Sequence, residues 1–581
     1  MIAAVASNKA QLTVKLPAWR ARTILILLLV GFLVLVGRAV YLQSVNKNFL
    51  RAKGEARYSR VVTLNANRGK ITDRNGEPLA ISSPVESVAA NPREVEISPK
   101  QLDKLAKLID AKPEELKKKF AEGRDFTYLK RQLSPETAER VLKLDIPGVF
   151  LQREYRRFYP NGEETAHLLG ITDLDDKGQE GIELAYESRL AGVHGSRRVL
   201  KDRLGNIIEG VESIRTPQEG QDIRLTIDRN IQFLAFKALT EAVNEHRAKA
   251  GAVVVLDAKT GEILAMVNQP TYNPNKRAKN MQSGNTRNRV VTDTFEPGST
   301  MKPFTAAIAI ESGRFKPDSV INTEGGKLSI GSATIHDAHA AGALTVAQVI
   351  QKSSNVGAAK MALTLPPEYM YSKFTKLGFG KTPQSGFPGE VAGRVRPYAS
   401  WLPIEQATMA YGHGISVSLL QLARAYTVFT SDGELRALSL IKQDQPLATE
   451  RVLSASTAQA LRGMLETVVL PGGTAPRAQV MGYRVAGKTG TAHKLDPRGG
   501  YAADRYVASF VGFAPVSDPR LIIAVMVDEP SAGQYYGGSV AAPVFSRIMA
   551  GALRMLSISP DMPTQNMLLP PLDAPEVREE T

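Results

Sequence analysis

Serine, lysine and asparagine recur in this chain in three short patterns whose residue types could perform nucleophilic chemistry. The patterns are Ser-x-x-Lys, Ser-x-Asn and Lys-Thr-Gly, and each occurs more than once. The Ser-x-x-Lys at Ser44 borders an apolar segment, and the Lys-Thr-Gly at Lys259 is typical of a hairpin turn. When such copies are set aside, one set remains in which Ser-x-x-Lys, Ser-x-Asn and Lys-Thr-Gly follow one another along the chain. These three motifs begin at Ser299, Ser353 and Lys488.

The first member, Ser299-Thr-Met-Lys302, follows Pro297-Gly298, which interrupts the chain just before a predicted helix. Residues at i and i+3 lie on one face of a helix, so Lys302 can lie one turn from Ser299. A serine hydroxyl becomes a nucleophile when a base removes its proton. A lysine can be that base where a dry, cationic site lowers its pKa. The alternative is a helix cap beside a solvated lysine, and for a single motif that interpretation would be preferred.

The ordered triplet is the signature of penicillin-binding proteins and class A β-lactamases. Over nearly its whole length the chain resembles class B penicillin-binding proteins, in particular the division type (FtsI type, penicillin-binding protein 3). The segments that carry this resemblance are RGKITDRNGEPLA, RRFYPNGEETAHLLG, GQEGIELAYESRLAG, AMVNQPTYNPN, FEPGSTMKPF, KSSNVG, YGHGISVSLLQLARAY, VAGKTGTAHK, FVGFAP and YYGGSVAAPVF.

The resemblance implies a role for each residue of the first two motifs. Ser299 would attack the D-alanyl-D-alanine carbonyl of a stem peptide, with Lys302 as its base. Ser353 would pass a proton to the departing D-alanine nitrogen, and Asn355 would hydrogen-bond the substrate amide. A β-lactam mimics the dipeptide and would acylate Ser299.

The third motif would bind the end of the substrate. The resemblance implies that Lys488, Thr489 and Thr491 hold its terminal carboxylate, a task suited to a cation with hydroxyl groups. Gly490 has no side chain, so an extended peptide could lie close to this strand. The backbone N–H groups of Ser299 and Thr491 would form the oxyanion hole. Each residue alone has an ordinary structural explanation, and it is their common order that favours catalysis.

The histidines suggest no further chemistry. His336 and His339 resemble a metal-binding pair, but no third ligand is evident. We interpret His413 as a packing residue and expect His493 to line the cleft. Serine acylation needs neither metal nor cofactor, so none is predicted. The chain has no cysteine, which excludes disulfides, thiolate zinc sites and cysteine nucleophiles.

An apolar run near the N-terminus, residues 23–42, is interrupted only by Arg38. A membrane-spanning helix needs roughly 20 residues. A cleaved signal peptide is the alternative, but no small-x-small cleavage site follows, so we predict an uncleaved anchor. Residues 1–60 hold ten Lys and Arg against one Glu. That excess fits attraction to anionic lipid better than nucleic-acid binding, which we do not expect.

Composition and patterning predict an α+β multidomain protein. We expect a hairpin at Asn75-Gly76, helices within 99–145, paired strands around Lys259–Gly261 and a helix over 411–426. The resemblance implies a central antiparallel sheet flanked by helices. The predicted division is a cytoplasmic tail at 1–22, a transmembrane anchor at 23–42, a β-rich pedestal of the dimerisation type at 43–222, a transpeptidase domain at 223–557 and a disordered tail at 558–581.

The leading functional prediction is a serine D,D-transpeptidase that cross-links peptidoglycan at the division septum. An elongation-type enzyme would usually carry Ser-x-Asp, so Asn355 favours division. A D,D-carboxypeptidase, a β-lactam sensor and a divisome scaffold remain alternatives. The resemblance implies a single-pass protein of the bacterial inner membrane with its catalytic domain in the periplasm. The implied partners are D-Ala-D-Ala stem peptides, β-lactams, an FtsW-type glycosyltransferase and other divisome proteins.

Overall fold

The computed structural model describes residues 17–45, 59–122, 124–201, 207–276, 285–496 and 499–562. The chain divides into two compact units. Unit 1 consists of the chain up to Asn65 together with residues 86–154 and 194–217. Unit 2 contains 66–85, 155–193 and everything from Gln218. Most of the predicted cytoplasmic tail and of the predicted disordered tail lies outside the described residues, and the predicted domain boundary at 222 stays a prediction.

The predicted anchor is one long apolar helix, α1 (Ala18–Val40), continued by a π-helical turn, η1 (Tyr41–Val45). Its large apolar side chains are exposed along its whole length, including Leu28 and Leu35. A helix of this length and composition can cross a membrane, and it is the sole such helix among the described residues. The structure therefore fits a single-pass anchor.

Unit 1 contains a small helical lobe and a three-stranded sheet. The helices α3 and α5 follow Ser98 and Ser134, whose hydroxyls accept backbone N–H groups of the first turn, with proline at the first helical position. These helices confirm the prediction for 99–145. The elements of unit 1 are β1 (Ser59–Leu64), α3 (Pro99–Leu108), α4 (Pro113–Ala121), β4 (Thr127–Leu133), α5 (Pro135–Leu142), β6 (Gly195–Lys201) and β7 (Ile207–Arg215), with β1, β6 and β7 in one sheet.

The strands β3 (Pro78–Ala90) and β5 (Val149–Phe158) carry residues of both units. Within unit 2, β3 pairs with β2 (Ile71–Thr72), and β2 pairs with β8 (Ile223–Arg224). The turn between β2 and β3 is closed by Asp73, which accepts the N–H groups of Asn75 and Glu77. The hairpin predicted at Asn75-Gly76 is thereby confirmed.

A buried charge cluster fixes the first segments of unit 2. Both Arg68 and Arg157 are almost fully buried, and their Nε atoms lie 2.7 and 2.6 Å from the carboxylate of Glu183. Arg68 also reaches Glu187 at 2.7 Å. Buried charges are tolerated only when they are paired in this way.

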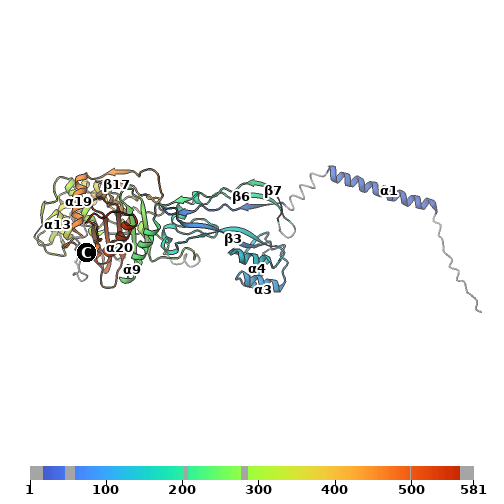
Figure 1. The fold of residues 1–581 in the computed structure, drawn as a ribbon, viewed down its shortest axis with the longest axis horizontal. Helices are drawn as coiled ribbons and strands as arrows, with labels where there is room; N and C mark the ends of the chain where they lie inside the picture. The colour runs from blue at the N-terminus through green and yellow to red at the C-terminus, as the bar shows by residue number, and fades with distance from the viewer. Residues whose placement is uncertain are drawn as a thin grey trace, which may run out of the picture. The chain divides into compact units, whose positions relative to one another are not determined.

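The core of unit 2 is a five-stranded antiparallel sheet with strand order β10-β9-β21-β20-β19. Every residue of β9 and β10 is buried, so both faces of the sheet are covered. The helices α9 and α20 (Figure 1) pack against each other and against the sheet. The helix α17 packs against β9 and β21. The predicted central antiparallel sheet flanked by helices is confirmed. These elements are α9 (Arg229–Glu245), β9 (Ala250–Asp257), β10 (Ile263–Gln269), α17 (Leu419–Ala425), β19 (Ala486–Leu495), β20 (Tyr501–Ala514), β21 (Leu521–Asp528) and α20 (Gly537–Met555).

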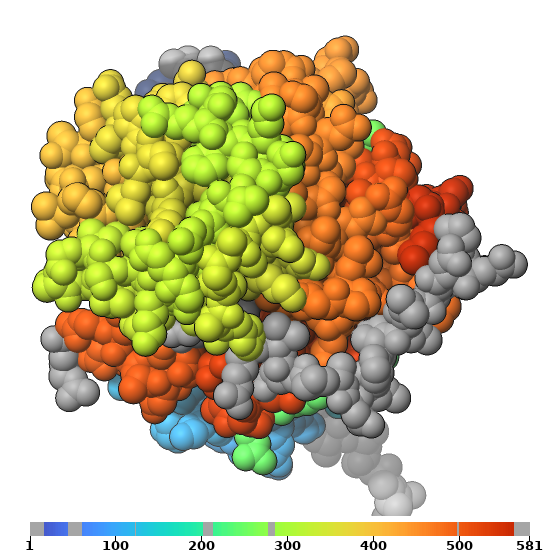
Figure 2. Space-filling view, turned by 90° about the vertical axis from the view of Figure 1, so that its left-hand side faces the viewer, coloured from blue at the N-terminus to red at the C-terminus, as the bar shows by residue number. Residues whose placement is uncertain are grey.

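A helical region fills the chain between β10 and β19, and Figure 2 shows much of it, coloured from green-yellow to orange, on the face turned to the viewer. Phe304, near the start of the helix that begins at Lys302, packs against Phe379, Tyr426 and Phe429, with ring centroids 5.1 to 5.3 Å apart. This aromatic cluster holds that helix against its neighbours. The longer helices here are α12 (Lys302–Glu311), α13 (Val346–Lys352), α14 (Asn355–Leu363), α15 (Pro367–Lys376), α16 (Pro403–Met409) and α19 (Ala455–Thr467).

The helix predicted over 411–426 is wrong in its first half. The helix α17 begins at Leu419, after the capping residue Ser418. Before it, Gly412 and Gly414 adopt positive φ angles, which a helix does not allow. A Cβ on Gly412 would lie 2.2 Å from the carbonyl oxygen of Gly298. The segment is thus a tight turn pressed against the chain beside Ser299.

Candidate active site

Ser299 lies in a short 3₁₀ turn, η3 (Gly298–Met301), and α12 begins directly after it at Lys302. In a 3₁₀ turn the side chains at i and i+3 eclipse one another. Lys302 Nζ accordingly donates to Ser299 Oγ at 2.9 Å. Lys302 is fully buried and Ser299 is 5% exposed. The sequence predicted this pair, although it placed both residues in an α-helix.

Ser353 ends α13 in the left-handed backbone region, with φ of +61°. Residues other than glycine adopt this conformation at a cost, and such strain is often found at functional sites. The turn directs two oxygens of Ser353 at one amine: Lys302 Nζ donates to the Ser353 carbonyl oxygen at 2.5 Å and to Ser353 Oγ at 3.1 Å.

Lys488 approaches the same serine from the sheet. It lies on β19, the edge strand, and its Nζ donates to Ser353 Oγ at 2.9 Å and to Thr489 Oγ1 at 3.2 Å. The hydroxyl of Ser353 therefore lies between the amines of Lys302 and Lys488. The three sequence motifs meet at this hydroxyl.

The hydroxyls of the third motif are anchored by neighbouring segments. Thr489 Oγ1 lies 2.7 Å from Thr474 Oγ1 in a buried pair. Thr491 Oγ1 accepts the backbone N–H of Gly537, the first residue of α20, at 3.0 Å. Each of these hydroxyls is thus held by a segment outside the third motif.

Gly490 is required by a close contact inside the protein. A Cβ there would lie 2.8 Å from the carbonyl oxygen of Pro297 and 2.5 Å from Ser509 Oγ. Only a residue without a side chain lets β19 pack this closely against the turn that carries Ser299. This reason differs from the one expected from the sequence, which was the approach of a substrate peptide to Gly490.

Asn355 begins α14 and is 6% exposed. Its backbone N–H donates to the carboxylate of Asp337 at 2.5 Å, and the N–H of Val356 donates to the same oxygen at 2.9 Å. The other carboxylate oxygen accepts from Ser354 Oγ at 2.6 Å. The Asn355 side chain donates to the carbonyl oxygen of His336 at 3.1 Å.

Asp337 is thus a supporting residue of the site that sequence reasoning missed. A carboxylate at a helix N-terminus satisfies free N–H groups and interacts favourably with the helix dipole. The only sequence signal lay in the segment IHDAH, whose histidines drew attention to metal binding. Within the part of the chain that the structure describes, no three His, Asp or Glu side chains converge on a metal site.

The ring of His413 lies between two tyrosine rings, 5.2 Å from Tyr411 and 5.7 Å from Tyr501. Burial lowers the pKa of His413 to about 4, with smaller contributions from the charge of Lys302 and from His493. At neutral pH this imidazole is uncharged, and its contacts are those of a packing residue.

His493 lies on β19, where it pairs with Tyr506 of β20. Its Nδ1 lies 2.8 Å from the carbonyl oxygen of Ala502, and its ring packs 4.5 Å from that of Tyr506. Tyr506 in turn stacks on Tyr535 at 4.1 Å. The side chain is held by these contacts, and its predicted place in the cleft stays a prediction.

Glu296, three residues before Ser299, was also missed by sequence reasoning. Its two carboxylate oxygens accept from the backbone N–H of Gly414 at 2.8 Å and from the hydroxyl of Tyr501 at 2.9 Å. Burial raises the pKa of Glu296, while these two hydrogen bonds act in the opposite direction. Its signal in the sequence was its place immediately before the Pro-Gly turn.

Comparison with known proteins agrees with this geometry. Residues 251–550 match the family model described as the penicillin-binding protein transpeptidase domain, and residues 63–225 match the penicillin-binding protein dimerisation domain. The chain is 46% identical over 549 residues to the probable peptidoglycan D,D-transpeptidase PenA of Neisseria gonorrhoeae, covering 94% of each protein. It is 40% identical over 560 residues to the peptidoglycan D,D-transpeptidase FtsI of Escherichia coli, covering 94% of this chain and 93% of that protein.

A solved structure shows the same architecture. Penicillin-binding protein 3 of Mycobacterium tuberculosis, complexed with aztreonam, aligns with a TM-score of 0.68 and 30% identity, over 87% of this chain and 99% of that one. Both family models, their order along the chain and the extended identity agree. The chain belongs to the class B penicillin-binding proteins and is an enzyme of the peptidoglycan D,D-transpeptidase type.

Proposed function

We propose that this enzyme cross-links peptidoglycan at the division septum through an acyl-enzyme on Ser299. The observation that carries the proposal is the buried contact of Lys302 Nζ with both Ser299 Oγ and Ser353 Oγ. A serine nucleophile needs a base within hydrogen-bond reach, and a leaving amine needs a proton donor. These three side chains meet both requirements.

In the first step the neutral amine of Lys302 takes the proton of Ser299. The Oγ–carbon bond to the penultimate D-alanine forms, and the bond from that carbon to the nitrogen of the last D-alanine breaks. Ser353 passes a proton to the departing nitrogen. Lys488, beside the same hydroxyl, keeps the surroundings cationic, a condition under which Lys302 can lose its own proton.

The substrate carboxylate would be bound by Lys488, Thr489 and Thr491. The hydroxyl of Thr491 is positioned by the backbone N–H of Gly537, which it accepts, and a hydroxyl is a group that can donate to a carboxylate oxygen. Because β19 is an edge strand, an extended peptide can pair with it through backbone hydrogen bonds. The N–H groups of Ser299 and Thr491 would stabilise the oxyanion.

In the second step the amine of a neighbouring stem peptide attacks the ester carbon, and Ser299 Oγ leaves with a proton. Hydrolysis by water would instead give a D,D-carboxypeptidase. The relatives of similar length are named transpeptidases, which supports the amine as acceptor. The relative bound to aztreonam supports acylation by β-lactams.

The septal role is supported by Asn355 in the second motif and by the similarity to FtsI. An FtsW-type glycosyltransferase and other divisome proteins would be the partners, reached through α1 and unit 1. The chemistry requires the catalytic domain on the outer side of the inner membrane, where stem peptides are exposed.

The acyl-enzyme is tested by adding benzylpenicillin to the full chain in detergent and recording its intact mass. We expect one drug adduct per chain and none on Ser299→Ala. Equal labelling of both proteins, or no label on the parent, would refute the assignment. Replacing the cell's own division transpeptidase with this chain tests the septal role. Restored septation supports it, and filaments with normal cell width contradict it.

A further inference from the structure

Glu296 lies next to the nucleophile and has no part in the proposed acyl transfer. It accepts hydrogen bonds from two different segments, the turn at Gly414 and the β19–β20 hairpin at Tyr501. Two such donors fix the position of its carboxylate. Since neither of them is charged at neutral pH, they orient the negative charge without neutralising it.

The direction of the donor peptide along β19 follows from the proposed function, on which this inference rests. Its terminal carboxylate would lie at Lys488, at the start of the strand. The nucleophile turn contacts the middle of the strand, since a Cβ on Gly298 would lie 3.3 Å from the carbonyl oxygen of Thr491. The donor residues before the scissile bond must therefore extend past Thr491 towards the end of β19, with about 3.3 Å for each residue.

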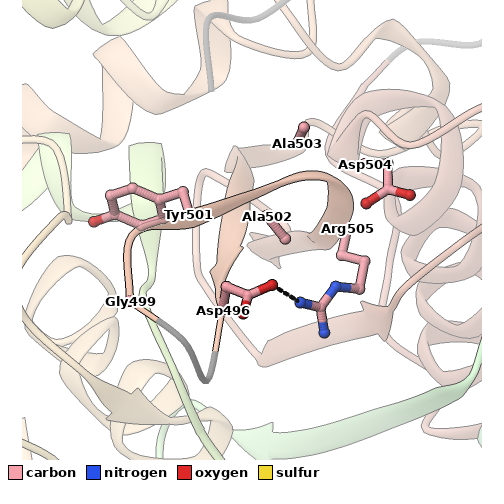
Figure 3. A pocket seen from close by; sticks show the side chains of 7 residues that line it. All are labelled: Asp496, Gly499, Tyr501, Ala502, Ala503, Asp504 and Arg505. Atoms are coloured by element: carbon pink, nitrogen blue, oxygen red, sulfur yellow. Dashed lines mark hydrogen bonds and ion pairs between the residues drawn. The ribbon is translucent and has the colours of Figure 1, made fainter.

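Glu296 is held at that end of the strand. Tyr501, which donates to it, is the partner of Leu495 in the strand pairing, whereas Thr491 pairs with Ala508. Figure 3 shows Tyr501 well apart from Arg505, whose ion pair with Asp496 at 2.9 Å lies in the lining of the polar hollow there. Tyr501, which also lines that hollow, donates its hydroxyl to Glu296.

The reaction itself indicates which charged group the donor peptide carries towards Glu296. An acceptor stem peptide must carry a side-chain amine, because that amine attacks the acyl-enzyme. Donor and acceptor stems are copies of one precursor. The donor therefore has the same amine, as an ammonium, on the diamino residue that precedes its two D-alanines.

We propose that Glu296 is a specificity residue that binds the side-chain ammonium of the donor stem peptide, with Tyr501 and the Gly414 N–H as its positioning groups. A hydrogen-bonded ion pair at a half-buried carboxylate favours a cationic donor over a neutral one. Burial without a cation disfavours the charged carboxylate, as the raised pKa of Glu296 reflects, and the donor ammonium offsets this cost. Among the described residues, Glu296 makes no ion pair that would compete with the donor.

The test compares two synthetic donor peptides that end in D-Ala-D-Ala and differ only at the preceding diamino residue. Its side-chain amine is free in one peptide and acetylated in the other. The release of D-alanine from each is measured with the full chain in detergent, and the ratio of the two kcat/KM values is taken. Within one variant this ratio cancels any difference in the amount of active enzyme.

We expect the parent to prefer the free amine by on the order of tenfold. Glu296→Gln should bring the ratio close to one, and Tyr501→Phe should give an intermediate ratio. Glu368→Gln, which removes one exposed carboxylate from α15, should keep the ratio of the parent.

Two results would overturn the inference. One is a parent enzyme that shows no preference between the two peptides. The other is an unchanged ratio in Glu296→Gln; if both rates fell equally, Glu296 would only hold the turn before Ser299. If the parent is not acylated by benzylpenicillin and releases no D-alanine from either peptide, the proposed function itself fails, and this inference fails with it.

Discussion

The carboxylate of Asp337 accepts the backbone N–H of Asn355 at 2.5 Å, and so binds the Ser-x-Asn motif to a strand and turn that precede it in the chain. Ser354 and Val356 donate to the same carboxylate. The second motif is therefore held by a side chain outside all three motifs. Its removal should disturb Ser353 and Asn355 together.

We expect Asp337→Ala to slow acylation by benzylpenicillin at least tenfold and to lower the free energy of unfolding by about 2 kcal/mol, because it leaves helix N–H groups without an acceptor. Stopped-flow labelling and urea unfolding measure the two effects. The control is Asp318→Ala, which removes an exposed aspartate that, like Asp337, precedes α13 in the chain. Full acylation speed in Asp337→Ala would show that Ser353 and Asn355 do not depend on this carboxylate.

Replacement of the proposed base gives a second prediction. Lys302→Met keeps an unbranched side chain in the buried site but has no amine. The rate of acylation by benzylpenicillin should fall by roughly 10³-fold, within the range for loss of a general base. Intact-mass measurement over time gives this rate. The amine of Lys352 donates to the carbonyl oxygen of Gly472, outside the motifs. The matched variant Lys352→Met should therefore lose far less of the acylation rate. Similar losses in both would contradict the role of Lys302.

The contact at Gly490 predicts a steric effect on the nucleophile. A methyl group there meets the carbonyl oxygen of Pro297, so Gly490→Ala should cost about 1–3 kcal/mol and displace the turn of Ser299. Thermal unfolding and the acylation rate should both report the change. Gly342→Ala, where a Cβ would meet nothing within 4 Å, should be neutral in both measurements. An active, stable Gly490→Ala would mean that β19 can move away from the turn.

The lowered pKa of His413 predicts a loss of stability in acid. Its pKa is about 4 in the folded protein, below the ordinary value of 6.5, so protons bind more tightly to the unfolded chain. The contribution of the neutral imidazole is fully present above pH 6.5 and is lost as the pH falls towards 4, by up to about 3 kcal/mol. His413→Gln should flatten this part of the stability curve, measured by urea unfolding between pH 4 and 7. If the pH dependence of stability were unchanged in His413→Gln, groups other than His413 would be responsible for the loss of stability in acid.

The buried pair of Arg157 and Glu183 predicts a large structural effect away from the site. Glu183→Gln leaves the buried guanidinium of Arg157 without its counter-charge and Arg68 with Glu187 alone, and it should cost about 3–5 kcal/mol. Glu187→Gln, at a carboxylate one third exposed, should cost less than 1 kcal/mol. Urea midpoints of the two variants give the comparison. Equal midpoints would show that water or rearrangement satisfies the arginines.

Local features of the fold could be predicted because neighbouring residues produce them. Ser98 and Ser134 before prolines start helices, and Asn75-Gly76 closes a hairpin. The helix prediction was wrong over 411–418, and this error also has a physical cause. The apolar spacing there suits a helix, but Gly412 must press against Gly298, and that contact decides the backbone.

Residue types and short spacings, such as that from Ser299 to Lys302, were enough to predict a nucleophile, a base and a relay. The apolar run was enough to predict an anchor, since about 20 apolar residues suffice for a helix that can span a membrane. Which distant groups hold these residues became visible with the tertiary structure. Three hydrogen bonds join segments that are separate in the chain. They connect Asp337 with Asn355, Thr474 with Thr489, and Tyr501 with Glu296. Such pairs leave no pattern in the sequence, because packing brings them together and no local propensity records them.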